Sequence, residues 1–258
     1  MMTHTVSPPQ DLCGMPEAFQ RAFGPTEPFE NEFGELEMPE LVPLPYRGNR
    51  KINPRSRGSS RSFPVWHDPQ TAMPRVFGCD SNVEKDHLAL TLMDTTTSQV
   101  HEQFGPISFI DAEGKPRTHF IDLLITKRDG RKIAVAVKPT ERLQSGKFLR
   151  DLNALQRTIV PHLADEVRLV TERCFSRADA FNAVMYQRFK LHPDATVETR
   201  FRDVLASTAG ETTICEVARR CRAGGRAFRV IVRAIFEGNL EKRSPGRIDL
   251  FTRVRRIS

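Results

Sequence analysis

Three side chains have the types that metal-dependent hydrolysis of a phosphodiester requires: Glu84, Asp122 and Lys138, in that order along the chain. Carboxylates hold Mg²⁺ against the scissile phosphate, and a nearby ammonium orients the attacking water and offsets the negative charge that develops. We therefore take all three as candidate catalytic residues. Glu84 and Asp122 are also the candidate ligands of Mg²⁺, with Mn²⁺ as the alternative ion.

The strands expected to carry Asp122 and Lys138 are joined by a turn that ends at Gly130, and the length of this turn decides which side chains meet. A type I turn closed by a left-handed Gly130 places Asp122 opposite Ala136. Lys138 then lies on the same face, diagonal to Asp122. A two-residue Asp-Gly turn would pair Asp122 with Val137 and direct Lys138 to the other face. The proposed chemistry requires the longer turn.

The surrounding pattern predicts the elements that position these residues. Ser81 and Glu84 form a capping-box signature at the start of a helix whose apolar residues recur at helical spacing. Short alternating or apolar runs bounded by turn residues predict strands, and a longer helical period precedes Pro161. The order is helix, meander of strands, helix and strand, which is typical of an α/β fold; after the first helix the segments are 107–110, 119–127, 132–138, 141–160 and 167–171.

Residues 81–139 resemble the N-terminal catalytic domain of TnsA-type transposase endonucleases, which have the restriction-endonuclease-like PD-(D/E)XK fold. The shared features are Ser-x-x-Glu at a helix start, the pair Glu102-Gln103 before a strand, Gly-Lys-x-Arg, an aspartate that enters a strand, and Val-Lys-Pro. The resemblance implies a restriction-endonuclease-like core, a mixed sheet flanked by helices, which we assign to residues 63–175.

The chain departs from this motif at two positions. Ile121 stands where the motif usually has proline, and Ala136 stands where it has glutamate or glutamine. A methyl group cannot ligate a metal, so a third ligand must come from elsewhere, and Glu141 is close enough in sequence to be a migrated carboxylate. The alternative is a cleavage-deficient relative that binds DNA or partner proteins as an assembly subunit.

The resemblance also implies a function and partners. TnsA-like subunits nick DNA at transposon ends, together with a DDE-type transposase and an AAA+ ATPase regulator. We therefore expect a metal-dependent DNA endonuclease subunit of a heteromeric transposase, with transposon-end DNA and those two proteins as its partners.

The C-terminal part, residues 176–258, is expected to be a mainly helical, winged-helix-like DNA-binding domain, as in TnsA-like proteins. Two predicted helices, 213–222 and 226–237, precede an alternating strand, 247–257. Between Arg219 and Arg256 there are twelve Lys or Arg and three acids, a surplus that suits phosphate contacts. The candidate DNA contacts here are Arg226, Arg229, Arg233, Lys242, Arg243, Arg247 and Arg253. The alternatives are a helical cap with solvated or paired arginines, and a winged-helix transcription regulator.

Residues 1–62 form a proline-rich arm, acidic and then basic, in which no helical or strand period is sustained. Its candidate phosphate contacts are Arg55, Arg57 and Arg61, although the same composition suits a solvated linker. The N-terminus has no secretory signal pattern, and no apolar run approaches the roughly 20 residues of a bilayer span. We therefore expect a cytoplasmic protein with no membrane partner.

Overall fold

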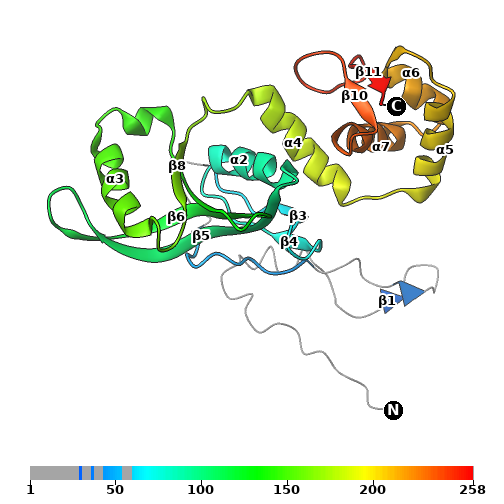
Figure 1. Cartoon of the computed structure of the whole chain (residues 1–258). Coiled ribbons are helices and arrows are strands. Elements are labelled where there is room, and N and C mark those ends of the chain that lie inside the picture. Colours follow the sequence, from blue (N-terminus) through cyan, green and yellow to red (C-terminus); the bar gives the residue numbers. More distant parts are fainter. Residues whose placement is uncertain (1–28, 31–35, 38–42, 54–59, 258) are drawn as a thin grey trace. The chain divides into compact units, whose positions relative to one another are not determined.

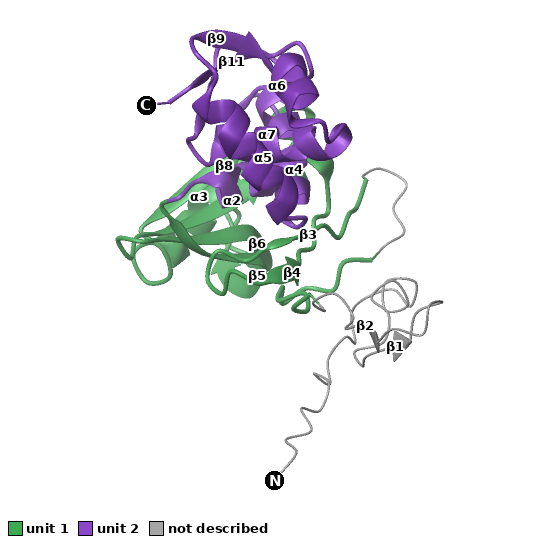
Figure 2. Cartoon of the chain, turned by 90° about the vertical axis from the view of Figure 1, so that its right-hand side faces the viewer, with its two compact units in different colours: residues 1–85, 96–171 green, residues 86–95, 172–258 purple. Residues whose placement is uncertain are grey.

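The computed structural model describes residues 29–30, 36–37, 43–53 and 60–257. The chain is an α/β protein with two compact units (Figure 2). Unit 1 comprises residues 1–85 and 96–171, and unit 2 comprises residues 86–95 and 172–258. Within the described ranges, no helix has the length and apolar character needed to cross a bilayer.

Unit 1 contains a mixed four-stranded sheet in the order β5-β6-β7-β8 (Figure 1). β5 (Thr97–Ile110), β6 (Pro116–Lys127) and β7 (Lys132–Val137) form the antiparallel meander, and β8 (Glu166–Val170) runs parallel to β7. The predicted meander and final strand are confirmed. The first strand starts at Thr97, earlier than expected, because its inner positions include the polar Glu102 and Gln103 and the sequence shows no apolar alternation there.

The turn between β6 and β7 has the longer form that the chemistry requires. The backbone N–H of Lys127 donates to the carbonyl oxygen of Arg131 at 2.8 Å, and the backbone N–H of Gly130 donates to the carbonyl oxygen of Lys127 at 3.0 Å. Gly130 has a φ of +87°, in the left-handed region. The register pairs Leu123 with Val135 and Leu124 with Ala134, which is the alignment expected for the longer turn; the ladder ends at Leu123, one residue before Asp122.

The predicted helix start at Ser81 is also confirmed. α2 (Asn82–Met93) follows Ser81, whose hydroxyl accepts the backbone N–H of Glu84 at 3.2 Å and donates to Glu84 Oε1 at 3.0 Å. This is a variant of the capping box, in which the Glu84 carboxylate reaches back to the Ser81 hydroxyl and the Asp80 N–H and not to the Ser81 N–H. It fixes the Glu84 carboxylate at the first turn of the helix.

The predicted helix over residues 141–160 is divided into two. A 3-10 turn, η1 (Thr140–Leu143), is followed by α3 (Lys147–Ile159), and Gly146 between them has a φ of +65°. Glycine adopts this conformation at little cost, so the chain changes direction there. α3 then packs Leu152, Leu155 and Ile159 against the small side chains of Ala134 and Ala136 on β7.

A buried ion cluster ties a second, two-stranded sheet to β5. In the antiparallel pair β3 (Val65–His67) and β4 (Pro74–Val76), Arg75 is 1% exposed. Its guanidinium lies 2.8 Å from both Asp68 and Glu102 and stacks 3.8 Å from the Phe77 ring centroid. If Glu102 moved out of the cluster, the charge of Arg75 would be left partly uncompensated in a buried place, which is costly. The cluster therefore fixes the position of Glu102 on β5.

Unit 2 is mainly helical and carries a small sheet in the order β10-β11-β9. The predicted helices are confirmed as α6 (Ile214–Cys221) and α7 (Gly225–Phe236). The predicted strand over 247–257 is shorter, because Asp249–Thr252 form a hydrogen-bonded turn and only β11 follows. The remaining elements were not predicted: α4 (Arg177–Lys190), α5 (Ala195–Ala206), β9 (Glu211–Thr213) and β10 (Leu240–Lys242); β11 is Arg253–Arg256.

α4 has a weak apolar period because its buried face includes polar residues. Asn182 is 3% exposed, accepts the backbone N–H of Ile248 at 2.8 Å and donates to the oxygen of Gly246 at 3.2 Å. Both bonds join α4 to the segment between β10 and β11.

Near the N-terminus, β1 (Phe29–Glu30) pairs with β2 (Leu36–Glu37).

Replacing Gly130 by alanine tests the turn. Among the described residues, no atom beyond the chain neighbours lies within 4 Å of an added Cβ there, so the cost comes only from the left-handed backbone, about 1 kcal/mol. Urea unfolding of Gly130→Ala should show that loss. Gly225→Ala is the matched control, since Gly225 has equal space and lies in α7, where alanine should be neutral or stabilising. Equal stability of the two variants would contradict the role of the turn.

Candidate active site

Asp122 and Lys138 lie near the end of the β6–β7 pair. Asp122 is 6% exposed, and its Oδ2 accepts the backbone N–H of Val137 at 2.7 Å. Lys138 directly follows β7 and bonds through its backbone N–H to the oxygen of Val170 at 2.9 Å. Its ammonium lies 5.3 Å from the centroid of the Phe148 ring. These contacts fix the surroundings of Asp122 and Lys138 at the end of the strand pair that the Gly130 turn joins.

Glu84 is the third predicted residue, and it is 7% exposed. Oε2 accepts the backbone N–H of Asp80 at 2.9 Å and the side-chain amide of Gln103 at 3.2 Å. Oε1 accepts the hydroxyl of Ser81. The carboxylate is thus held by groups from the helix start and from β5.

The pKa values show that these groups act on one another. Burial, and then the negative charge of Asp122, raise the pKa of Glu84 to about 7. Burial also raises the pKa of Asp122, although the Lys138 ammonium and the Val137 N–H oppose that shift. The structure therefore brings the three predicted residues into one electrostatic neighbourhood.

Further cations lie beside this pair of carboxylates. Arg50 forms an ion pair with Asp80, and Arg61 Nε lies 3.2 Å from the second oxygen of Asp80. His119 stays neutral at physiological pH, because burial and then the charges of Lys138 and Arg50 lower its pKa to about 4. The sequence did not single out Arg50 or Asp80. The other predicted contacts of the arm, Arg55 and Arg57, lie outside the described residues.

The donor set fits a hard divalent cation. Two buried carboxylates repel each other without a cation between them, and carboxylate oxygens are the ligands that Mg²⁺ and Mn²⁺ prefer. β7 adds no side-chain oxygen, because Ala136 is fully buried in the contact with α3. Glu141 is exposed in the first turn of η1 and belongs to no three-member ligand cluster among the described residues.

A second acidic group, which the sequence did not indicate, lies at the β5–β6 connection. Ligand atoms of Asp111, Glu113 and Asp151 lie within 4.8 Å of one another, so this group could hold a metal ion. Asp111 is already engaged: it accepts backbone N–H groups from Glu113 and Lys115, and Arg117 Nε at 2.9 Å. The guanidinium is the main reason that the pKa of Asp111 is lowered.

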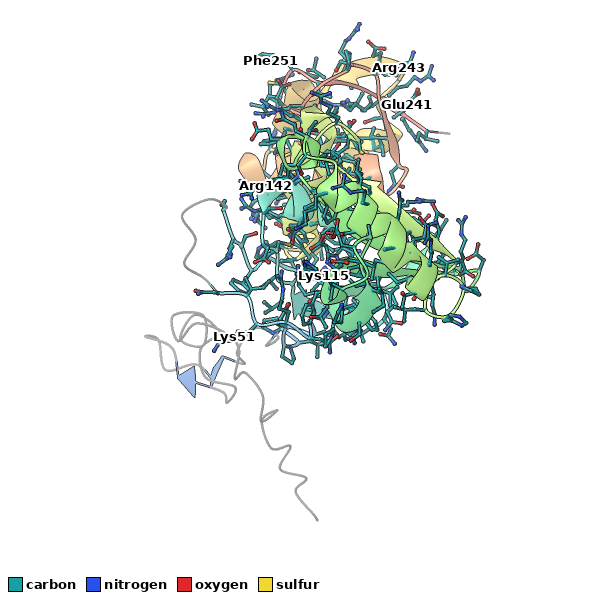
Figure 3. The ribbon with its side chains drawn as sticks, turned by 90° about the vertical axis from the view of Figure 1, so that its left-hand side faces the viewer. Lys51, Lys115, Arg142, Glu241, Arg243 and Phe251 are labelled. Carbon is teal, nitrogen blue, oxygen red and sulfur yellow. The ribbon has the colours of Figure 1, made fainter. Side chains whose placement is uncertain are left out.

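In unit 2, many of the predicted DNA-contacting arginines form ion pairs within the unit. Arg226 lies 2.7 Å from Asp194, and Arg233, whose side chain is 15% exposed, lies 2.6 Å from Glu198. Acids outside the basic window thus neutralise part of its surplus. An ion pair within the window, Arg243 with Glu241, is labelled in Figure 3. The further pairs are Arg243–Glu211, Arg253–Glu211, Arg255–Glu241 and Arg219–Glu216.

Three predicted contacts of unit 2 have no ion pair among the described residues. Arg229 lies half-buried on α7. Lys242 donates to the oxygen of Gly246 at 2.6 Å, and the guanidinium of Arg247 stacks 4.5 Å from the centroid of Phe181. These three side chains retain charges that could meet a phosphate.

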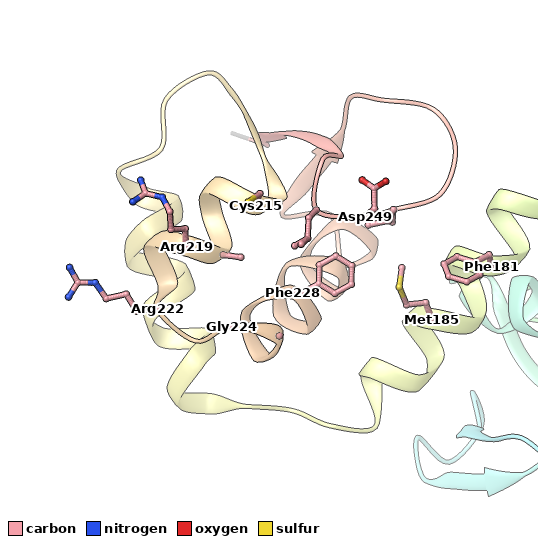
Figure 4. Close-up of a pocket in the computed structure, with 12 residues that line it drawn as sticks. Phe181, Met185, Cys215, Arg219, Arg222, Gly224, Phe228 and Asp249 are labelled. Atoms are coloured by element: carbon pink, nitrogen blue, oxygen red, sulfur yellow. The ribbon is translucent and has the colours of Figure 1, made fainter.

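Unit 2 also contains an apolar cavity of about 780 Å³ (Figure 4). Phe181, Met185 and Phe228 form much of its wall. Figure 4 shows the side chains of Arg219 and Arg222 pointing away from Phe228. Its lining includes Asp249 but neither the Glu84–Asp122 pair nor the second acidic group, so the cavity has no part in the metal chemistry considered for them.

No protein-family model matches the chain, and no curated protein matches it.

The raised pKa of Glu84 predicts how stability depends on pH. The folded state binds this proton more tightly than the unfolded chain, so its contribution is full below about pH 4.5 and is lost as the pH rises through about 7. In EDTA, the unfolding free energy should fall between pH 5 and pH 8 by up to about 3 kcal/mol. Glu84→Gln should make this fall smaller, and the part that remains comes from Asp122, whose pKa is also raised.

Urea unfolding at several pH values measures the effect, and Glu113→Gln is the control because Glu113 is exposed. Addition of Mg²⁺ at pH 8 should stabilise the parent protein more than Glu84→Gln. Parallel pH profiles for the parent and Glu84→Gln would contradict the assignment.

Proposed function

We propose that this protein is a metal-dependent DNA endonuclease, the TnsA-like subunit of a heteromeric transposase that nicks DNA at transposon ends. One observation carries the proposal: the β6–β7 register aligns Asp122 with the strand end that bears Lys138, and Asp122 in turn shifts the pKa of Glu84. Carboxylates and an ammonium in this relation are the groups that phosphodiester hydrolysis needs.

The topology of unit 1 supports a restriction-endonuclease-like core. A helix carries the first acid, an antiparallel meander carries the second acid and the lysine, and α3 connects β7 to the parallel β8. This is the element order expected from the resemblance of residues 81–139 to TnsA-type enzymes.

Each residue would have its own task in the reaction. Mg²⁺ or Mn²⁺ held by Glu84 and Asp122 would polarise the scissile phosphate and lower the pKa of the attacking water. The N–H of Val137 fixes the rotamer of Asp122. Lys138 orients the water and offsets developing charge, and Arg50 adds positive potential for the DNA backbone.

The topology of unit 2 supports a winged-helix role in DNA binding. α5, β9, α6 and α7 precede the hairpin of β10 and β11, and β11 pairs with β9. That order gives a helix-turn-helix, α6 and α7, followed by a wing. Among the predicted contacts, Arg229, Lys242 and Arg247 are the best placed to meet phosphates, since none of them forms an ion pair within the described part of unit 2.

A specific observation favours a second candidate, a cleavage-deficient assembly subunit that binds transposon ends. Ala136 occupies the position of the motif's third ligand and is sealed in the core by α3. By the same resemblance, the proposed partners in either case are a DDE-type transposase and an AAA+ ATPase regulator.

Nicking of supercoiled transposon-end DNA tests the endonuclease. With Mg²⁺ or Mn²⁺, and with the partner transposase present, Asp122→Asn and Lys138→Ala should each reduce the nicking rate by at least about 100-fold, because each removes a group used in the transition state. Glu113→Gln is the control and should nick normally, since Glu113 is exposed and belongs to the second acidic group. Absence of nicking in every preparation, with DNA binding intact, would favour the assembly subunit.

DNA binding as a function of salt tests unit 2. Arg229→Ala should weaken binding and reduce the slope of log K against log salt by about 1, the effect of one phosphate contact, without lowering the melting temperature. Arg233→Ala is the matched variant on the same helix. It should lower the melting temperature instead, because Arg233 joins α7 to Glu198 of α5. Identical salt slopes for Arg229→Ala and the parent would remove Arg229 from the interface.

A further inference from the structure

Resting on the proposed nuclease, we propose that the side-chain oxygen of Gln103 is a third protein ligand of the divalent cation and replaces the oxygen that Ala136 lacks. Gln103 is fully buried on β5. Four observations point to this role: its place in the sheet, its spacing from Glu84, an oxygen without a partner, and an unusual backbone conformation.

Gln103 lies across from Asp122 in the sheet. Its neighbour Glu102 pairs with Leu123, and its other neighbour, Phe104, pairs with Ile121. On the far side of Asp122, the register of β6 and β7 leads to Ala136. The three positions thus form a row across β5, β6 and β7. Asp122 supplies a carboxylate at the central position. Ala136 on β7 offers only a methyl group, and Gln103 on β5 offers a carboxamide.

The spacing between Gln103 and Glu84 suits a shared ion. Nε2 of Gln103 lies 3.2 Å from Oε2 of Glu84. Adjacent oxygens around Mg²⁺ are about 3.0 Å apart, because each Mg–O bond is about 2.1 Å long and the geometry is octahedral. A half-turn of the carboxamide exchanges its nitrogen and oxygen and brings Oε1 to that spacing.

The oxygen of the carboxamide is not otherwise used. Oε1 of Gln103 is buried and has no hydrogen-bond partner in the described part of the chain. Buried polar atoms are nearly always satisfied, so a carboxamide that meets Glu84 with one atom and leaves the other unpaired indicates a ligand that the protein chain does not itself provide. A cation at Glu84 would take the oxygen of the turned carboxamide as a further ligand.

The backbone at Gln103 is held in an uncommon conformation. Its φ is +49°, in the left-handed region, and the pairing of β5 with β6 shifts register just beyond it, between Phe104 and Ile107. Irregular strands re-aim side chains and are frequent beside functional sites. On the preceding residue, the ion pair of Glu102 with Arg75 anchors the strand. The backbone conformation of Gln103 and the anchored position of Glu102 therefore direct the carboxamide to Glu84.

Binding of Mn²⁺ to the full-length protein without DNA, followed by electron paramagnetic resonance and competed by Mg²⁺, tests this role. Gln103→Met, of similar size but without an oxygen donor, should weaken Mn²⁺ binding by about tenfold or more. Gln103→Glu should bind at least as tightly as the parent, since it keeps an oxygen and adds charge. Melting in EDTA checks that both variants fold.

Asp122→Asn and Asp151→Asn separate the possible failures. If Asp122→Asn abolishes binding while Gln103→Met binds like the parent, the ligand role of Gln103 is overturned and the proposed metal site stands. If only Asp151→Asn abolishes binding, the ion occupies the second acidic group and the proposed active-site metal fails as well. Weak binding by Gln103→Met, with recovery in Gln103→Glu, supports the inference.

Discussion

The left-handed conformation of Gly130 is the constraint on which the candidate site depends. It makes the turn between β6 and β7 one residue longer than a two-residue hairpin turn, and side chains alternate along a strand. With the shorter turn, Asp122 would pair with Val137 and Lys138 would lie on the opposite face. One backbone angle at the surface therefore determines whether Asp122 and Lys138 are expected on the same face of the sheet.

Around that hairpin, each acidic group is held by a different physical means. The capping box fixes Glu84 at the start of α2, and a backbone N–H holds Asp122. The buried Arg75 cluster secures β5 at Glu102, the residue before Gln103. These restraints hold both carboxyls in a buried place, where desolvation raises the pKa of each, and the charge of Asp122 raises the pKa of Glu84 further. A bound cation would remove that repulsion, so stability and metal binding should be linked.

Unit 2 shows that a basic sequence does not translate directly into a basic surface. Arg226 and Arg233 pair with Asp194 and Glu198, and these ion pairs hold α7 against α5. Such pairs stabilise the domain and reduce the charge that DNA would meet. The proposed DNA contacts therefore narrow to Arg229, Lys242 and Arg247.

The sequence by itself determined the local features of this protein: the capping box at Ser81, the three strands of the meander, α6 and α7, and the types of Glu84, Asp122 and Lys138. These depend on periods, caps and turn residues close together in the chain. It could not show α4, whose buried face is partly polar, or the ion pairs of α7 with α5. Only the tertiary structure decided that Gln103 meets Glu84 and that Ala136 is sealed by α3, because those contacts join strands and helices distant in sequence.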